Sequence, residues 1–160
     1  MTSRLLVLAD THIPRRARRL PDPVLDMLPA VDGIIHLGDF TQLEVAEMLE
    51  QFGDLHAVSG NNDCVDIRSR FPLTQRLDVD GHRIVLLHGD VGGRTALEAA
   101  RSVRAADAVL FGHSHRPWCS REAGTLLFNP GSPTDRRWAP RCSFGILTIG
   151  RSIDATLIRL

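Results

Sequence analysis

The sequence contains no tyrosine and no lysine, and only three of its 160 residues are cysteines. Three widely spaced cysteines without a Cys-x-x-Cys pair argue against a disulfide framework or a structural zinc knot, so we expect Cys64, Cys119 and Cys142 to be free thiols. Acidic and basic residues both number 19. The balanced charge gives no general attraction to nucleic acid or to a membrane surface.

Long apolar runs are also missing. No stretch approaches the ~18 residues of a membrane span, and Leu5–Ala9 is too short for the core of a signal peptide. We therefore predict a cytoplasmic protein with no membrane contact. Its length favours a single domain over residues 1–160, because a chain of this size buries roughly 70% of its unfolded surface. No linker or repeat divides it.

The sequence does contain five short apolar runs that each lead directly into a polar motif. Runs of this length predict strands. In open α/β sheets the ligand crevice lies beyond the carboxyl ends of the strands, so we expect the motifs to meet on one rim. The motifs are Asp10-Thr11-His12, Gly38-Asp39, Gly60-Asn61-Asn62-Asp63, His88-Gly89-Asp90 and Gly112-His113-Ser114-His115.

Other segments predict helices and hairpins. Residues 41–53 combine a capping box with an amphipathic repeat, and residues 94–104 predict a second helix. Asp80-Gly81 predicts a tight hairpin, and paired strands around Gly124 and Gly150 make the last third mostly β. Together these elements predict an α/β fold, a four-layer α/β/β/α sandwich of two mixed β-sheets flanked by helices.

The motifs supply seven side chains with oxygen or nitrogen donors and no thiolate. Such donors suit a moderately hard divalent ion such as Mn²⁺, Fe²⁺, Co²⁺, Ni²⁺ or Zn²⁺. Two ions ~3.5 to 4 Å apart can clamp a phosphoryl group and hold a deprotonated water. We therefore predict two divalent metal ions, with Mn²⁺ first among these metals and Asp39 as the bridge. The predicted ligands are Asp10, His12, Asp39, Asn61, His88, His113 and His115.

In order and spacing, the motifs resemble those of the calcineurin-like metallophosphoesterases. Asn129-Pro130-Gly131-Ser132 is similar to a loop of their small, single-domain prokaryotic phosphodiesterase branch. The resemblance spans residues 4 to about 149. It implies that a hydroxide bridging two metals attacks the phosphorus of a small phosphoester. It also implies one metal on Asp10, His12, Asp39 and His115, and the other on Asp39, Asn61, His88 and His113.

Many members of that family carry a histidine after the metal-binding asparagine, where this chain has Asn62. An amide can donate a hydrogen bond to a phosphoryl oxygen but cannot protonate a leaving group. We therefore predict a phosphodiesterase that favours good leaving groups, with Asn62 in catalysis and substrate binding. Asp63 is predicted to support catalysis by accepting a hydrogen bond from a metal-binding imidazole. Asp90, where close relatives often have histidine, receives no ligand role.

Several positions keep two interpretations. Arg116 is predicted to contact substrate, with an ordinary surface position as the alternative. The loop 14–23, which holds four arginines, is either a solvated surface or a phosphate clamp. Arg136, Arg137 and Arg141 with Trp118 and Trp138 form either a partner surface or pocket rim, or a stacking surface for single-stranded nucleic acid. His36 and Asn129 are expected to be a core histidine and a turn former.

Alternative functions also stay open at this point. A phosphomonoesterase is the nearest, and a nuclease is disfavoured because it usually needs a larger basic track. A third alternative is a non-catalytic metal-binding scaffold, as in the retromer subunit of similar fold. The oligomeric state, including a homo-oligomer, and the natural substrate do not follow from the sequence.

Overall fold

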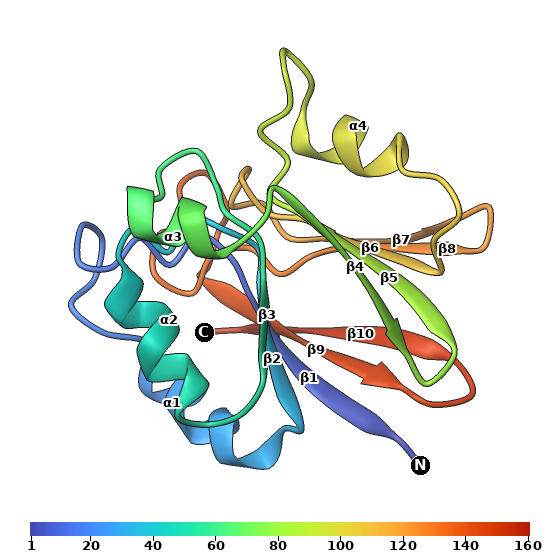
Figure 1. Cartoon of the computed structure of the whole chain (residues 1–160), viewed down its shortest axis with the longest axis horizontal. Helices are drawn as coiled ribbons and strands as arrows, with labels where there is room; N and C mark the ends of the chain where they lie inside the picture. Colours follow the sequence, from blue (N-terminus) through green and yellow to red (C-terminus); the bar gives the residue numbers. More distant parts are fainter.

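The computed structural model describes all 160 residues and arranges ten strands in two sheets of five (Figure 1). The order in the first sheet is β10 (Ile153–Arg159), β9 (Ser143–Ile149), β1 (Ser3–Leu8), β2 (Gly33–His36) and β3 (Leu55–Ala57). The order in the second sheet is β4 (Thr74–Val79), β5 (His82–Leu87), β6 (Ala108–Leu110), β8 (Thr125–Asn129) and β7 (Trp118–Glu122).

Both sheets are mixed, as predicted. In the first, β1 pairs in parallel with β2 and antiparallel with β9. In the second, β6 pairs in parallel with β5 and with β8, while β4 and β7 join antiparallel at the edges. The turn between β4 and β5 is the predicted hairpin, with positive φ at both Asp80 and Gly81 (51° and 80°). This is the twist that a tight hairpin requires.

Helices cover the outer face of each sheet, which confirms the α/β/β/α sandwich (Figure 1). The helices α1 (Asp22–Met27), α2 (Leu43–Glu50) and α3 (Val65–Arg70), with a 3₁₀ turn at Leu28–Ala30, lie on the side of the first sheet. The helix α4 (Ala96–Arg101) covers the second sheet.

The apolar run of β1 shows why a sandwich forms. Leu5 and Val7 belong to the core between the sheets, whereas Leu6 and Leu8 belong to the core under the helices. Successive side chains of a strand point to opposite faces, so a strand covered on both sides is apolar throughout. The five predicted runs correspond to β1, β2, β3, β5 and β6. The polar motifs that follow these strands lie together at one edge of the molecule.

Two details of the helix predictions were wrong. Thr41 does not cap α2, whose N-cap is Gln42 without a side-chain bond. Instead the N–H of Thr41 donates to Asp63 Oδ1 at 2.9 Å, and its hydroxyl donates to the Ile13 carbonyl. The loop predicted over residues 14–23 also ends earlier, because α1 begins at Asp22. The capping box found in the structure joins Thr95 and Glu98 at the start of α4.

Two absences predicted from composition can be compared with the structure. Cys64, Cys119 and Cys142 are all free. No helix combines the length and the apolar character that crossing a membrane would require.

Candidate metal centre

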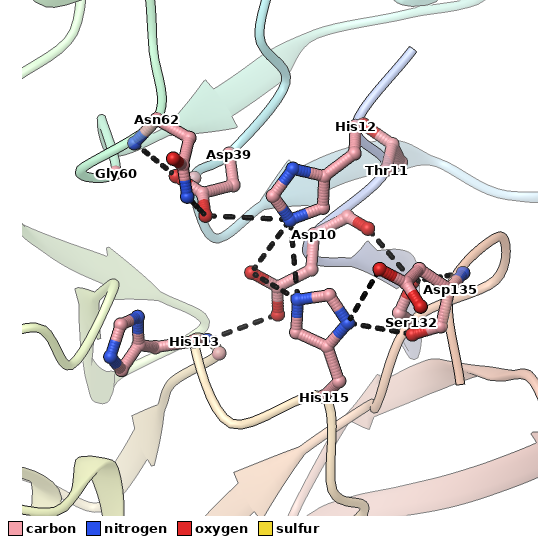
Figure 2. Close-up of polar contacts among 12 residues, drawn as sticks. Asp10, Thr11, His12, Asp39, Gly60, Asn62, His113, His115, Ser132 and Asp135 are labelled. Carbon is pink, nitrogen blue, oxygen red and sulfur yellow. Dashed lines mark hydrogen bonds and ion pairs between the residues drawn. The ribbon is translucent and has the colours of Figure 1, made fainter. Parts of the chain in front are cut away.

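The structure brings all seven predicted ligands together at the carboxyl ends of the strands. Asp10, His12 and His115 form what we call the inner half-site, in which every side chain is buried. The Nε2 atoms of His12 and His115 are 3.2 Å apart. Asp10 Oδ1 lies 3.9 Å from the first and 3.6 Å from the second (Figure 2).

Asn61, His88 and His113 form the outer half-site. His88 Nε2 is 3.1 Å from Asn61 Oδ1 and 3.3 Å from His113 Nδ1. His88 is buried, but His113 is only partly buried and Asn61 is exposed. In Figure 2 the ring of His113 points away from His12 and His115. The outer half-site therefore faces solvent.

Asp39 stands between the two half-sites. Its Oδ2 is 3.4 Å from His12 Nε2 and 3.3 Å from His88 Nε2. A single carboxylate oxygen thus faces one imidazole of each half-site, which is the position a bridging ligand needs.

An unpaired carboxylate oxygen indicates that these residues fit a cation. Asp10 Oδ1 is buried and has no hydrogen-bond partner. It lies 3.6 to 3.9 Å from the Nε2 atoms of His12, His88 and His115. Leaving a charged oxygen buried and unpaired is costly, and a divalent ion among these nitrogens would satisfy it. The donor set, without thiolate, suits such an ion.

Burial sets the protonation of the inner half-site. It raises the pKa of Asp10 to about 7, and it lowers the pKa of His115 to about 4 and that of His12 below its ordinary value. Neutral imidazoles are the form that binds metal. The inner histidines are therefore ready to coordinate at neutral pH.

The middle of the site behaves differently. Burial alone would lower the pKa of His88, but its hydrogen bond to Asp39 and the charges of Asp10 and Asp39 raise it to about 9. Burial would likewise raise the pKa of Asp39, but hydrogen bonds from His88 and Asn62 hold it well below its usual range. The protonated imidazole of His88 therefore supplies the positive charge beside Asp39 that a metal cation would supply.

The backbone is strained where the ligands attach. Asp10, His12, Asp39, His113 and His115 all have positive φ, between 44° and 69°. This left-handed region costs a non-glycine residue roughly 1–3 kcal/mol and is concentrated at functional sites. Glycine at two neighbouring positions avoids steric overlap with the side chains of Asp39 and His88. A Cβ on Gly60 would lie 2.2 Å from Asp39 Oδ1, and one on Gly38 would lie 2.8 Å from His88 Nδ1.

The inner half-site is held in place by Ser132, Thr134 and Asp135, of which only Ser132 belongs to a motif recognised from the sequence. The Nδ1 of His115 is hydrogen-bonded to the Asp135 carbonyl at 2.6 Å. Ser132 Oγ donates to the Asp10 carbonyl at 2.8 Å, and Thr134 Oγ1 donates to the Thr11 carbonyl at 2.6 Å. The signal for Ser132 was the Asn-Pro-Gly-Ser motif, whereas Thr134 and Asp135 stand in no motif. In the outer half-site the Leu37 carbonyl holds His88 Nδ1 in the same way, at 2.7 Å.

Asn129 and His36 lie where their structural interpretations placed them. Asn129 bonds the Gly112 carbonyl and Ser114 Oγ, both at 3.1 Å, and so supports the histidine loop. His36 is fully buried and stacks on Phe40. Its ring nitrogens contact Thr11 Oγ1 at 3.0 Å and the N–H of Gly38 at 3.2 Å.

Asp63 has different partners from those expected. No imidazole donates to it; instead its carboxylate accepts the N–H groups of Asp39, Thr41 and Gly60, at 2.9, 2.9 and 2.6 Å. Through these three backbone donors Asp63 acts as a clip that fixes the loop that carries Asp39. Asn62 lies beside Asp39, donating to Oδ1 from its N–H at 2.8 Å and to Oδ2 from its side chain at 2.9 Å.

The arginines divide into paired and unpaired ones. Arg16 of the loop 14–23 pairs with Asp135 at 3.2 Å, and Arg15 lines a cleft of about 320 Å³ together with Asn62. Arg136 and Arg141 are bonded to backbone carbonyls. Arg116 is exposed and has no carboxylate within 4 Å.

Two nearby charges also act on the ligands. Arg137, 3.9 Å from Asp135, contributes to the lowered pKa of His12 and His115 after the larger effect of burial. Asp90 is exposed and lies outside the ligand set; its charge opposes the lowering of the pKa of His113, which burial causes.

Comparison with known proteins identifies relatives that are similar in sequence. A family model described as the calcineurin-like phosphoesterase superfamily domain matches residues 4–152. The chain is 35% identical to a probable metallophosphoesterase of Methanocaldococcus jannaschii, with 95% of this chain and 79% of the relative covered. It is 32% identical to a probable metallophosphoesterase of Methanothermobacter thermautotrophicus, with 96% and 90% covered.

Solved structures resemble the fold over nearly the whole chain. Vacuolar protein sorting 29 from Cryptosporidium parvum superimposes with a TM-score of 0.82 at 20% identity, covering 99% of this chain and 98% of that one. A protein described as a novel archaeal phosphodiesterase superimposes with a TM-score of 0.76 at 23% identity, covering 98% and 99%. At these identities the likeness concerns the fold alone.

Proposed function

Because this chain belongs to the calcineurin-like phosphoesterase superfamily, we propose that it is a metal-dependent phosphodiesterase acting on small phosphoesters. The observation that carries the proposal is the buried, unpaired Oδ1 of Asp10 among three imidazole nitrogens. We propose Mn²⁺ as the metal, since the donors are oxygen and imidazole nitrogen. The inner ion would be held by Asp10, His12, Asp39 and His115, and the outer ion by Asp39, Asn61, His88 and His113.

Divalent ions at these positions would polarise the phosphoryl oxygens and lower the pKa of a water. The residues of the chain position the two half-sites and the substrate. Asp39 keeps both half-sites in register, and Asp63 fixes the loop that carries Asp39 through three backbone N–H groups. We propose that Asn62, whose side chain donates to Asp39 Oδ2, exchanges this bond for one to a phosphoryl oxygen when substrate binds.

A diester fits the exposed side of the site better than a monoester. The residue beside the bridge is an amide, which cannot protonate a poor leaving group. Arg116 has no carboxylate within 4 Å, and we propose that its guanidinium pairs with the negative charge of the diester phosphate. The name of the archaeal phosphodiesterase with the same fold supports this preference.

The test is hydrolysis of bis(4-nitrophenyl) phosphate and of 4-nitrophenyl phosphate by chelator-stripped protein, with and without added Mn²⁺. We expect Mn²⁺-dependent turnover, faster on the diester. Faster turnover of the monoester would select the phosphomonoesterase alternative. Turnover that persists in excess chelator would contradict the metal mechanism.

The scaffold is a second candidate because Vacuolar protein sorting 29 has the same fold. The donors of both half-sites are present in this chain, which favours the enzyme. A folded, metal-loaded sample that hydrolyses neither ester would select the scaffold instead.

A further inference from the structure

Both tryptophans of the chain line one cavity of about 330 Å³. Its wall is mainly apolar and carries no carboxylate. Two of its polar residues, Ser114 and Arg116, flank the proposed ligand His115 in sequence. The cavity therefore lies against the loop that carries His113 and His115. Its apolar residues are Ala96 and Leu97 at the start of α4, Phe111 after β6, Trp118 in β7, and Trp138 and Ala139.

The two tryptophans are held differently. Trp118 is fixed, because its Nε1 donates to Ser120 Oγ at 2.8 Å and the Arg101 guanidinium lies 5.8 Å from its ring centroid. Trp138 is 90% exposed. An indole side chain that stays in water forgoes the large hydrophobic free energy that its burial would provide. It lies three residues after Asp135, whose carbonyl holds His115.

We propose that this cavity binds an aromatic ester group of the phosphodiester substrate, with the aromatic ring against Trp138 and the phosphate beside Arg116. The inference rests on the proposed function and adds the class of ester to it. A volume of about 330 Å³ accommodates an aromatic ring system, and it lies at the lower end of the roughly 300–1,000 Å³ of small-molecule sites. The lack of acidic residues in the wall suits an anionic substrate.

Tryptophan emission measures binding directly, because no tyrosine contributes and both tryptophans line the cavity. The probes are phenylphosphonate and methylphosphonate, whose carbon–phosphorus bonds resist hydrolysis, titrated into Mn²⁺-loaded protein. We expect phenylphosphonate to shift or quench the emission and to bind at least about tenfold tighter than methylphosphonate, as stacking on an aromatic side chain predicts.

Trp138→Ala should remove most of this phenyl preference, read both from the remaining Trp118 emission and from competitive inhibition of bis(4-nitrophenyl) phosphate hydrolysis. Phe52→Ala is the matched control, because Phe52 is an exposed aromatic residue (44%) that lines a different cavity. It should leave the preference unchanged.

Equal affinity for the two phosphonates, or a preference that survives Trp138→Ala, would overturn the proposal. An emission shift on raising the protein concentration alone would assign the cavity to contact between two copies. Tighter binding of oligothymidylate than of phenylphosphonate would assign it to single-stranded nucleic acid. Fluorescence needs no turnover, so a phenyl preference without hydrolysis would contradict only the proposed function, and hydrolysis without the preference only this inference.

Discussion

The inner and outer half-sites contain similar side chains but are held very differently. The inner side chains are 0–5% exposed, and Ser132, Thr134 and Asp135 bond to the segments that carry them. In the outer half-site only His88 is buried, and Asn61 reaches into solvent. A ligand set that is fixed beforehand loses little freedom when an ion binds. We infer that the inner half-site binds metal first and that the outer one combines metal binding with access for substrate.

Replacing Asp39, the proposed bridging ligand, should have the largest effect because both half-sites depend on it. Asp39→Ala would leave two cations without the carboxylate that faces both, so we expect loss of both ions and of hydrolysis. Metal content after gel filtration and turnover of bis(4-nitrophenyl) phosphate check this. Asp154→Ala, at an exposed aspartate on β10, is the control. A variant that lacks Asp39 but keeps both metals would disprove the bridge.

One substitution in each half-site measures how unequal they are. His115→Ala removes a buried ligand, and we expect Mn²⁺ to bind the inner half-site at least about a hundredfold more weakly. Asn61→Ala removes an exposed amide ligand, and we expect a loss of about tenfold that is confined to the weaker ion. Calorimetric titration of chelator-stripped protein separates the two. Equal losses would mean that burial does not distinguish the half-sites.

Asp63, which fixes the loop that carries Asp39, should matter for stability as well as for activity. Asp63→Ala leaves the N–H groups of Asp39, Thr41 and Gly60 without their acceptor, which should cost at least about 3 kcal/mol of unfolding free energy. Asp63→Asn keeps one acceptor oxygen and should lose less. Urea unfolding in the presence of chelator measures both. A loss below about 1 kcal/mol for the alanine variant would show that the clip is dispensable.

Replacing His36 should have the smallest effect, and its specific sign is a change in how the unfolding free energy depends on pH. Burial lowers its pKa from 6.5 to about 3, so the unfolded chain takes up a proton between these values and the folded chain does not. Its contribution to stability is therefore complete above pH 6.5 and is lost toward pH 3, by up to about 1.4 kcal/mol per unit.

His36→Asn keeps an acceptor for the Gly38 N–H without a titrating ring. The variant should be less stable at pH 7, yet its metal-free stability should fall less steeply between pH 6 and 4 than that of the natural protein. Parallel slopes in urea unfolding would contradict the buried neutral state of His36.

The sequence predicts which side chains gather at the candidate site because these side chains follow strands. A short apolar run indicates both where a strand ends and which side chain comes next, so Asp10, Asp39 and His88 could be placed on one rim. The apolar character of β1 likewise predicts a sheet covered on both faces, and Asp80-Gly81 predicts the hairpin. These features depend on neighbouring residues alone.

The sequence does not reveal the contacts that form between segments far apart in the chain. The carbonyl of Asp135 reaches His115 across 20 residues, and Thr134 reaches Thr11 across 123. Thr41 has the local pattern of a helix cap, but Asp63 and Ile13 compete for its polar groups and prevail. Trp118 and Trp138 line one cavity, as the pocket-rim interpretation expects, but no local pattern predicts that Ala96, Leu97 and Phe111 complete its wall.

The most direct test of the unequal half-sites is a crystal of chelator-stripped protein soaked with one molar equivalent of Mn²⁺ and measured for anomalous scattering. We expect one peak among Asp10, His12, Asp39 and His115, and a second peak near His88 and Asn61 only when Mn²⁺ is in excess. A first peak in the outer half-site, or equal peaks in both at one equivalent, would contradict it.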